Sequence, residues 1–597
     1  MSLRDRARTD PGLACVVLSI LSVVALYAST VGRGIVNFDD PWLYRDNWVL
    51  QDLTWSTLRA VWLELDSPAR YALSPEYLPV RDMSVMLDFQ LWGGWYGGFH
   101  LTNVLLYVLA IVVWFAALVE LGVERATAGL AILIWAVHPS HAESVAWLSE
   151  RKGLLGALFS GTCALAYARC RAGRSVAWLA LALVAAVLAV WSKALAAFTV
   201  AALAPLELVL PGRASWRRSL VGLGALGLVG GLAFIPVVLL AAQANVVGID
   251  VVAPAGRAEM VAGVAGFYLR MGAMLAPNAI SYPLSALGPS VLDVVVGIVG
   301  LAALVGLAAA PGIGTWRPTP ELRAGACVWL VTWFPVSHLV LGLQMVYVAD
   351  RYQLMPTLGI ALIAAALLRR ISRDRARVAL IAVVVLAAAL RTLDAQSNWR
   401  DDLTLWERAT VSNPRDPKAW SAYAYTLSEL GADDLAWEAI ERGLTYAPSP
   451  NLLLRKAVML ELRGERDAAF ATMREAAEGG ELRAMSNLAL LLHDRGETAE
   501  ALAWARRSTA GAPLAPRFRA HGKIALAAGQ LPEALAAFRA AYAYEPTVPA
   551  NRYNLALALI GLHRAQEAIP HLLACANAPA TAADCRRELS KFQRVEP

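Results

Sequence analysis

The chain has 597 residues, of which 58% are hydrophobic and only 17% are charged, and its formal net charge is +6. This composition is too apolar for a soluble enzyme of this length. The modest charge, without a basic helix or an aromatic and basic platform, argues against a nucleic-acid-binding protein. Apolar runs recur up to about Leu393, after which polar and charged residues predominate. The sequence therefore predicts an integral membrane region followed by a soluble region.

The apolar runs are long enough to cross roughly 30 Å of hydrocarbon as helices. We interpret the first run as a retained anchor rather than a cleaved signal peptide, because the residues directly after it carry chemistry. The eleven predicted spans are 13–31, 101–121, 128–146, 147–168, 176–192, 197–211, 219–243, 291–310, 324–341, 353–368 and 378–394.

Arginines lie in the loops before the first span and after alternate spans, for example Arg4, Arg125, Arg171 and Arg213. With eleven spans, every arginine cluster lies on one face, which the positive-inside rule makes cytoplasmic. The abundance of arginine and alanine suggests a GC-rich bacterial genome. We therefore expect a multi-pass protein of the bacterial inner membrane, with a cytoplasmic N-terminus and a periplasmic C-terminal region.

Two long loops then lie outside, at 32–100 and 244–290. The segment 258–276 is apolar but carries Arg270 near its middle. Counting it as a twelfth span would move the cluster 369–377 to the outer face. We therefore expect an amphipathic or re-entrant helix within the second outer loop, with a twelfth span as the alternative.

From Lys418 onward the chain repeats. Small residues recur in two series, whose steps are 33, 32, 33 and 34 residues. Glycines separate the paired helices in four units, and His563 takes that place in the fifth. The pattern is that of tetratricopeptide repeats, whose small residues let paired helices pack closely. The series are Ala424, Ala457, Ala489, Gly522 and Ala556, and Ala436, Ala469, Ala501, Ala534 and Ala568.

The six cysteines show no metal-binding spacing. Cys575 and Cys585 lie close together near the C-terminus, and they could form a disulfide if this region faces an oxidising compartment. The other four lie in or near apolar spans, which is typical of buried free thiols.

Ionisable side chains gather at the predicted outer ends of the spans. Asp39 and Asp40 directly follow the first span. Charges at membrane depth cost roughly 2.5–3.5 kcal/mol on insertion scales, so they indicate function. A carboxylate pair with several cations at one membrane surface favours a general base beside a phosphate-binding site. The other polar residues are Arg81, Asp82, Asp88, His100, Asn103, His138, His141, Glu143, Arg151, Lys152, Lys193, Arg270, His338, Asp350, Arg351 and Tyr352.

Four stretches followed by the repeats resemble the TMTC family of transmembrane and tetratricopeptide repeat-containing O-mannosyltransferases, in the GT-C class of glycosyltransferases. They are "NFDD", "PVRDMSVMLDFQLWGGWYGGFHLTNVLLY", "AVHPSHAESVAWLSERKGLLGALF" and "SNWRDDLTLWERA". The resemblance covers nearly the whole chain. The family usually has Lys-Glu at Lys193-Ala194, which argues against an acidic role at position 194. The family usually has Glu-Arg-Tyr where this chain has Asp350-Arg351-Tyr352, so the negative charge of the first residue is kept.

The resemblance implies an all-α protein with a GT-C-like bundle of about eleven spans over residues 1–394 and a tetratricopeptide solenoid over 395–597. It also implies a polyprenyl-phosphate-linked sugar donor, with a hexose such as mannose transferred with inversion to Ser or Thr of a periplasmic protein. The repeats would bind a protein or peptide. An acidic residue of the first outer loop would be the general base, and Asp39 matches best, with Asp40 second.

The departing lipid phosphate gains negative charge, which Arg or Lys would stabilise. Lys193 and Arg351 are the first choices, followed by Arg151 and Arg81. We expect no cofactor and no nucleotide site; a divalent metal at Asp39, Asp40 and Glu143 is the alternative. The residues expected to position donor or acceptor are His138, His141, Glu143, Asp82, His100, Tyr352 and His338.

Other interpretations stay open. Asp39 could be a structural helix cap or salt-bridge partner, Arg151 a snorkelling anchor, and the two histidines His138 and His141 structural hydrogen-bonding groups. The acceptor could be a glycan or lipopolysaccharide, and the chain could also be a non-catalytic scaffold or a transporter. The sequence leaves the sugar, the carrier length, the acceptor and the oligomeric state undefined.

Overall fold

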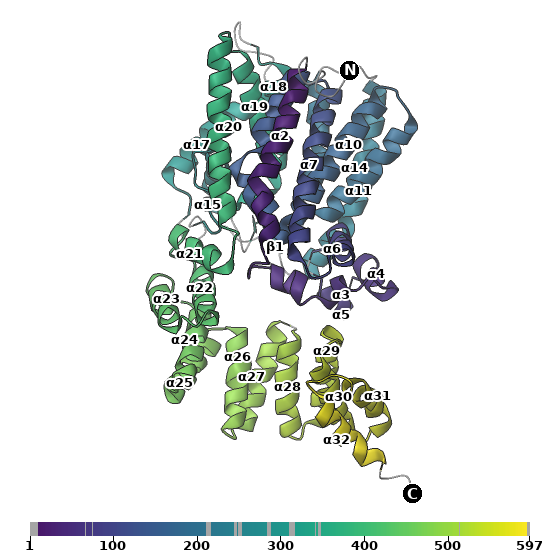
Figure 1. Cartoon of the computed structure of the whole chain (residues 1–597), viewed down its shortest axis with the longest axis vertical. Coiled ribbons are helices and arrows are strands. Elements are labelled where there is room, and N and C mark those ends of the chain that lie inside the picture. Colours follow the sequence, from purple (N-terminus) through teal and green to yellow (C-terminus); the bar gives the residue numbers. More distant parts are fainter. Residues whose placement is uncertain are drawn as a thin grey trace. The chain divides into compact units, whose positions relative to one another are not determined.

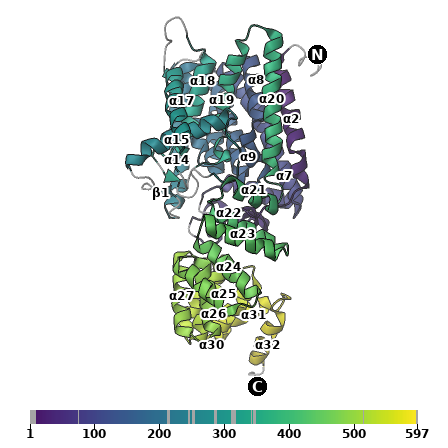
Figure 2. The same cartoon turned by 90° about the vertical axis from the view of Figure 1, so that its left-hand side faces the viewer.

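The computed structural model describes residues 10–65, 67–73, 76–210, 216–243, 247–248, 254–282, 288–309, 317–340, 342–343, 348–512 and 514–593. These residues are almost entirely helical (Figures 1 and 2). The two strands in this part of the chain, β1 (Val247–Gly248) and β2 (Gly342–Leu343), form one short antiparallel pair. The predicted all-α class is therefore confirmed.

The chain forms two compact units. The first comprises Met1–Leu65 and Leu73–Ser412, and the second comprises Asp66–Ala72 and Asn413–Pro597. The predicted boundary after residue 394 falls inside helix α20 (Asp374–Ser397), and the next helix, α21 (Asp402–Ser412), belongs to the first unit.

The other helical elements of the first unit fall into two groups. In the N-terminal half they are α2 (Pro11–Tyr27), η1 (Ala28–Gly32), η2 (Pro41–Arg45), α3 (Trp48–Gln51), α4 (Trp55–Trp62), α6 (Pro79–Trp92), α7 (Tyr96–Leu121), α8 (Arg125–Ala136), η3 (Pro139–His141), α9 (Ala142–Ala146), η4 (Leu148–Glu150), α10 (Arg151–Arg171) and α11 (Val176–Ser192). They are followed by α12 (Ala196–Ala201), α13 (Leu203–Val209), α14 (Trp216–Gln243), α15 (Pro254–Gly272), α17 (Val291–Ala309), α18 (Pro320–Trp333), η5 (Phe334–Val336), η6 (Asp350–Tyr352) and α19 (Pro356–Arg369).

Among the described residues, six helices are long and apolar enough to cross a membrane: α2 with η1, α7, η4 with α10, α14, α17 and α20. In Figure 1 the long axes of α2, α7, α10 and α20 run side by side. Shorter apolar helices lie among them, including α8, α11 and α19. The first unit is thus built as a multi-pass membrane protein.

Ion pairs join the arginine-rich ends of several helices. Asp10 at the start of α2 pairs with Arg125, Glu124 pairs with Arg369 at 2.5 Å, and Glu120 pairs with Arg169 at 3.2 Å. Helices α2, α7, α10 and α19 each have one terminus at this end of the unit. Their other termini adjoin the predicted outer residues, so the basic loops and the chemistry-bearing loops lie at opposite ends of the bundle.

Several predicted spans are not single α-helices, and three of them break well inside the predicted range. The span 128–146 breaks because α8 ends at Ala136, and His138 is extended before Pro139, as a residue preceding proline prefers. The span 197–211 divides into α12 and α13, and the span 324–341 changes to 3₁₀ geometry at Phe334. In each case the straight helix ends inside the predicted span, so the apolar run is longer than the helix.

The helix predicted within 258–276 is α15. It packs on α17 at a close crossing, where a Cβ added at Gly266 or Gly297 would overlap the backbone of the other helix. Arg270 forms an ion pair with Asp293 of α17 at 2.6 Å. The charge that set this segment apart in the sequence is therefore compensated by a neighbouring helix.

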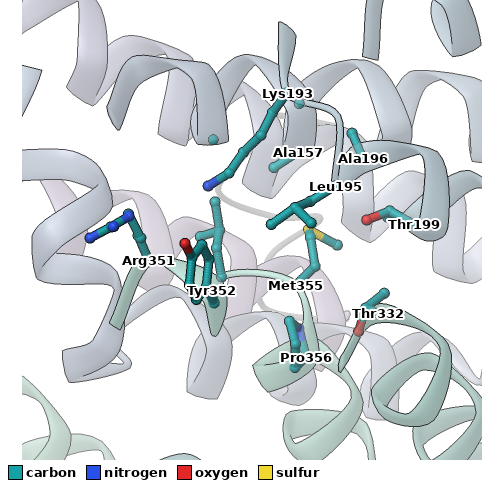
Figure 3. A pocket seen from close by; sticks show the side chains of 13 residues that line it. Ala157, Lys193, Leu195, Ala196, Thr199, Thr332, Arg351, Tyr352, Met355 and Pro356 are labelled. Atoms are coloured by element: carbon teal, nitrogen blue, oxygen red, sulfur yellow. The ribbon is translucent and has the colours of Figure 1, made fainter. Parts of the chain in front are cut away.

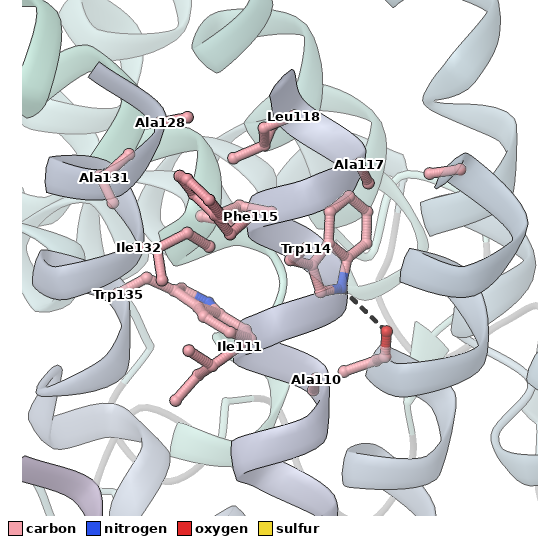
Figure 4. Close-up of a cluster of buried hydrophobic side chains, with 14 of the residues drawn as sticks. Ala110, Ile111, Trp114, Phe115, Ala117, Leu118, Ala128, Ala131, Ile132 and Trp135 are labelled. Atoms are coloured by element: carbon pink, nitrogen blue, oxygen red, sulfur yellow. Dashed lines mark hydrogen bonds between the residues drawn. The ribbon is translucent and has the colours of Figure 1, made fainter. Parts of the chain in front are cut away.

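The main core of the first unit lies between α7, α8 and α10, where aromatic and alanine side chains interlock (Figure 4). Trp114 is almost fully buried, and its indole Nε1–H donates to the carbonyl oxygen of Ala157 at 2.8 Å. This bond satisfies the polar atom of a large buried side chain without water. The core fixes the helices whose ends carry the candidate site.

The repeats of the second unit are five helix pairs, as predicted, followed by one further helix. The small residues of both series are buried where the paired helices meet, and a Cβ added at Gly522 would contact the Phe538 ring. The helices are α22 (Pro417–Glu429), α23 (Asp433–Tyr446), α24 (Pro450–Leu462), α25 (Arg466–Glu478), α26 (Leu482–Asp494), α27 (Thr498–Gly511), α28 (Ala515–Ala527), α29 (Leu531–Tyr544), α30 (Pro549–Gly561), α31 (Ala565–Cys575) and α32 (Ala582–Gln593). The short α5 (Pro68–Tyr71) also groups with this unit.

The turn between paired helices needs a left-handed residue. All four predicted glycines have positive φ, between 72° and 82°, and His563 has φ 58° at the fifth turn. Histidine is among the side chains that tolerate this region. The end of the array is fixed by a disulfide between Cys575 and Cys585, the pairing that the sequence suggested.

Candidate functional site

The short segment Trp147–Glu150, between α9 and α10, connects the loop that carries Asp39 and Asp40 with the predicted cations. We call residues 33–41 the acidic loop. All four of its residues are buried. The Ser149 N–H and Oγ–H donate to Asp40 Oδ1 at 3.1 and 2.5 Å. The neighbouring Glu150 forms an ion pair with Lys193, and the Trp147 ring lies 5.7 Å from the Arg351 guanidinium. We call Trp147–Glu150 the bridging segment.

The two adjacent aspartates have different environments. Asp40 is 1% exposed, and its Oδ2 also accepts from the Val36 N–H at 3.2 Å. Asp39 is exposed, and its carboxylate has no hydrogen bond or ion pair with any described residue. Asp40 therefore fixes the loop to the bridging segment, whereas Asp39 keeps its oxygen lone pairs open to an incoming group.

Burial raises the pKa of Asp40 from 3.8 to about 7. The hydrogen bonds from Ser149 and Val36 oppose this shift, and the negative charge of Asp39 adds to it. Desolvation therefore favours the neutral form of Asp40.

Lys193 and Arg351, the two cations chosen first from the sequence, line one pocket (Figure 3). Its free space, open mouth included, is about 400 Å³. Tyr352 lies between them, with its ring centroid 5.9 Å from Lys193 Nζ and 5.1 Å from the Arg351 guanidinium carbon. The other lining residues are Gly153, Gly156, Ala157, Leu195, Ala196, Thr199, Thr332, Leu354, Met355 and Pro356.

Each pocket cation has a buried carboxylate partner. Lys193 pairs with Glu150, whose second oxygen Oε2 has no hydrogen-bond partner among the described residues. Glu143 accepts from both the Arg351 side chain at 2.6 Å and its backbone N–H at 2.7 Å. Since an isolated buried charge is costly, these carboxylates compensate the two cations near the pocket.

Glu150, Ser149 and Trp147 were missed at the sequence level. The stretch "WLSERKG" drew attention only to Arg151 and Lys152, because the two cations matched the expected phosphate chemistry. The adjacent Glu150 would have been a candidate on the same reasoning, since a buried lysine requires a counter-ion.

Arg151 and Arg81 lie outside the pocket lining. Arg151 is fully buried and bonds to Asp88, Asn103 and the Phe99 carbonyl, at 2.5, 2.8 and 2.9 Å. Arg81 is also buried and pairs with Asp82 at 2.5 Å. Arg151 thereby joins α10 to α6 and α7, whereas Arg81 also donates to the Leu73 carbonyl at 2.9 Å and so holds the segment before α6.

The predicted histidines are buried among structural partners. His141 bonds to Tyr107 Oη at 2.6 Å and to Thr357 Oγ1 at 2.7 Å, and His138 bonds to the Gly272 carbonyl at 3.1 Å. His100 bonds to the Gly34 carbonyl at 3.1 Å and so supports the acidic loop. His338 is buried with a positive φ of 60°. Among the described residues, no three His, Cys, Asp or Glu side chains form a metal-binding group.

A second buried carboxylate adjoins the Arg351 site. Asp350 accepts from Tyr282 Oη and from Asn278 Nδ2, the latter at 2.7 Å. Burial, and then the negative charge of Glu143, raise the pKa of Asp350 well above its usual value. Asp350 therefore favours the neutral acid, which limits repulsion with Glu143.

Helix α21 and the end of α20 hold the acidic loop from its other side. The Asn37 N–H donates to Asp402 Oδ1, and Arg33 Nη1 donates to the Gln396 carbonyl at 2.8 Å. Phe38 packs on aromatic rings from both sides: on Trp147 at 5.1 Å and, in a stacked arrangement, on Trp406 at 5.4 Å. The loop is thus held between the bridging segment and α21.

No protein-family model matches the chain, and no curated protein matches it in sequence. Solved structures show low similarity. The apo oligosaccharyltransferase of Archaeoglobus fulgidus has a TM-score of 0.38 and 16% identity, covering 74% of this chain and 60% of that one. ArnT from Cupriavidus metallidurans, bound to undecaprenyl phosphate, has a TM-score of 0.34 and 17% identity, covering 78% of this chain and 80% of that one. The tetratricopeptide protein YrrB has a TM-score of 0.26 and 15% identity, covering 31% of this chain and 97% of that one. At these TM-scores the similarities do not establish a shared function.

The raised pKa of Asp40 predicts a pH-dependent contribution to stability. The folded protein holds this proton up to about pH 7, whereas the unfolded chain releases it near pH 4, so stability falls as pH rises between these values. The shift corresponds to at most about 4 kcal/mol. Thermal unfolding of the purified protein in detergent from pH 4 to 8 should therefore show a smaller decline for Asp40→Asn than for wild type. Asp46→Asn, on an exposed residue of the same loop, is the control, and parallel curves for wild type and Asp40→Asn would contradict this assignment.

Removing the Asp402 carboxylate should loosen the acidic loop. A hydrogen bond to a charged group contributes about 1.5–3 kcal/mol, so Asp402→Ala should speed amide exchange at Asn37 roughly tenfold or more. Hydrogen exchange of peptides covering residues 33–41 measures this. Asp394→Ala, which removes an exposed carboxylate from the same connection, should leave the exchange unchanged. Equal protection in wild type and Asp402→Ala would show that α21 does not hold the loop.

Proposed function

We propose that this chain is a membrane glycosyltransferase that moves a hexose from a polyprenyl-phosphate donor to a hydroxyl of a periplasmic protein, with inversion. The observation that carries the proposal is that Lys193 and Arg351 line one pocket, which the bridging segment connects to Asp39 and Asp40. In this proposal the pocket binds the donor phosphate and the acidic loop supplies the base, which are the two groups that the reaction needs.

The pocket suits the phosphate of a lipid-linked sugar. Two cations from different segments of the chain can contact separate oxygens of one phosphate, and they stabilise the negative charge that develops as the glycosidic bond breaks. The pocket wall also contains apolar side chains, including Leu195, Leu354 and Met355. A lipid-linked donor requires this combination of charge and apolar surface.

Asp39 is the proposed general base. A Ser or Thr hydroxyl is a poor nucleophile until a base within about 3 Å accepts its proton. The exposed carboxylate of Asp39 can accept that proton, and the oxygen can then attack the anomeric carbon from the side opposite the departing phosphate. Asp40 is proposed to position Asp39, because its own carboxylate already accepts bonds from Ser149 and Val36.

The buried carboxylates Glu150 and Glu143 are proposed as counter-ions of the pocket before the donor binds. A phosphate entering the pocket must share Lys193 and Arg351 with them, which weakens ground-state binding. As the leaving phosphate gains charge, its attraction to the two cations increases. The same pairs therefore favour the transition state over the bound substrate.

Asp39→Asn should lower kcat by roughly 10²–10⁴-fold while changing KM for the donor little, because the base acts in the chemical step. The measurement is transfer by the purified full chain from labelled polyprenyl-phosphate hexoses, mannose first, to Ser- and Thr-containing peptides. Asp46→Asn is the matched control in the same loop. Wild-type rates in both Asp39→Asn and Asp40→Asn would remove the base assignment, and absence of transfer with every donor would remove the proposed function.

Lys193→Gln and Arg351→Gln should each lower kcat about 10²-fold, since each removes a cation from the proposed phosphate site. Lys152→Gln is the control, because Lys152 pairs with Glu76 at 2.6 Å and lies outside the pocket lining. Arg351→Lys should restore only part of the rate, because lysine cannot reproduce the planar fork that faces Glu143. A control that loses as much activity as Lys193→Gln would place the phosphate elsewhere.

A further inference from the structure

Three arginines lie on one face of the first helices of successive repeats. Arg455, Arg483 and Arg517 are on α24, α26 and α28, which contact one another in order. They precede the small residues of their helices by two, six and five positions. At about 100° per residue, their directions fall within about 100° of one another, on the side opposite the small residues. We call these residues the arginine face.

Two of these arginines lack an ionic partner. Among the described residues, neither Arg455 nor Arg517 forms an ion pair, whereas arginines on the second helices do, such as Arg474 with Glu500 at 2.6 Å. Arg517 is only 9% exposed, and its Nε–H has no hydrogen-bond partner in this part of the chain. A largely buried guanidinium without a direct ion pair is costly, so this arrangement points to an anionic ligand.

The remaining contacts leave the face basic. Arg455 stacks over the Tyr425 ring at 4.5 Å and donates to Ser421 Oγ at 3.3 Å, both neutral groups. Burial, and then the charge of Arg483, lower the pKa of Arg455 to about 10, so it stays protonated at physiological pH. Glu481 forms an ion pair with Arg483 at 3.2 Å and also interacts electrostatically with Arg455 and Arg517. This one carboxylate does not balance three arginines, so the face stays basic.

Amide side chains continue the same face. Asn487 and Asn554 stand two positions before the small residues of their helices, as Arg455 does. Neither amide has a hydrogen-bond partner among the described residues. A side-chain amide offers both a donor and an acceptor, which matches the N–H and C=O groups of an extended peptide. A simple anion or a polyphosphate would use only the donor.

We propose that the arginine face binds an extended, acidic peptide segment, whose Asp or Glu carboxylates contact Arg455, Arg483 and Arg517. That this segment belongs to the acceptor protein rests on the proposed function. Peptide binding itself does not, so the two can fail separately. The repeats would then select acceptors that carry acidic residues near their hydroxyl groups.

The test is fluorescence anisotropy with the full-length protein in detergent and three labelled peptides of about 10 residues, which is long enough to cross three helices. The peptides alternate Ser with Glu, Gln or Lys. We expect the Glu peptide to bind at least tenfold more tightly than the Gln peptide, with affinity falling as salt increases, and the Lys peptide to bind most weakly.

The double variant Arg455→Gln with Arg517→Gln should weaken binding of the Glu peptide about tenfold or more. Its affinity for the Gln peptide should equal that of wild type. The control is the double variant Arg506→Gln with Arg539→Gln, which removes the same charge from the second helices α27 and α29. It should bind the Glu peptide as tightly as wild type does. Because a buried arginine can be required for folding, Arg483→Gln, at the exposed member of the face, provides a second test with an expected loss of about threefold. Circular dichroism verifies the repeats in every variant.

Equal affinity for the Glu and Gln peptides would overturn the proposal. So would equal losses in the face and control variants, or tighter binding of a single-stranded oligonucleotide than of the Glu peptide. Glu-peptide binding without sugar transfer would support the arginine face and count against the proposed function. Sugar transfer to peptides without any preference for Glu would support the proposed function and count against the arginine face.

Discussion

The candidate site depends on the hydrogen bonds from Ser149 to Asp40. They connect a loop that follows the first helix with a segment more than a hundred residues later in the chain. That segment also carries Glu150, the partner of Lys193. A small displacement of the bridging segment would therefore move the acidic loop and a pocket cation together. The proposed base and the proposed phosphate site keep their spacing because one short, buried piece of backbone contacts both.

Buried charge explains why the surrounding residues take their positions. Each cation near the pocket is compensated by a carboxylate from a different element: Lys193 by Glu150 and Arg351 by Glu143. Such pairs contribute little net stability, because desolvation offsets the attraction, but breaking one leaves an uncompensated ion. They therefore act mainly to exclude alternative packings of the helix ends. Arg151, which bonds to three partners on α6 and α7, has the same effect without lining the pocket.

The periodic features of the fold could be predicted from the sequence. Repeat spacing located the paired helices, and even His563 was identified as the residue replacing a turn glycine. Straight spans were less predictable, because apolar runs do not reveal where a helix breaks, as at Pro139. In the site, residue chemistry identified Lys193 and Arg351, but it could not rank arginines by environment. Arg151 is equally cationic in sequence, and only tertiary contacts show that its donors are already used.

Helix α21 gives the protein a natural point of dissection. The aromatic stack of Phe38 with Trp406, and the carboxylate of Asp402 beneath Asn37, both lie after the last long apolar helix. Cutting the chain where hydrophobicity ends would remove them and leave the acidic loop unsupported. Cutting after Ser412 would keep them with the bundle. The smallest part of the chain that retains these contacts thus extends beyond its last long apolar helix.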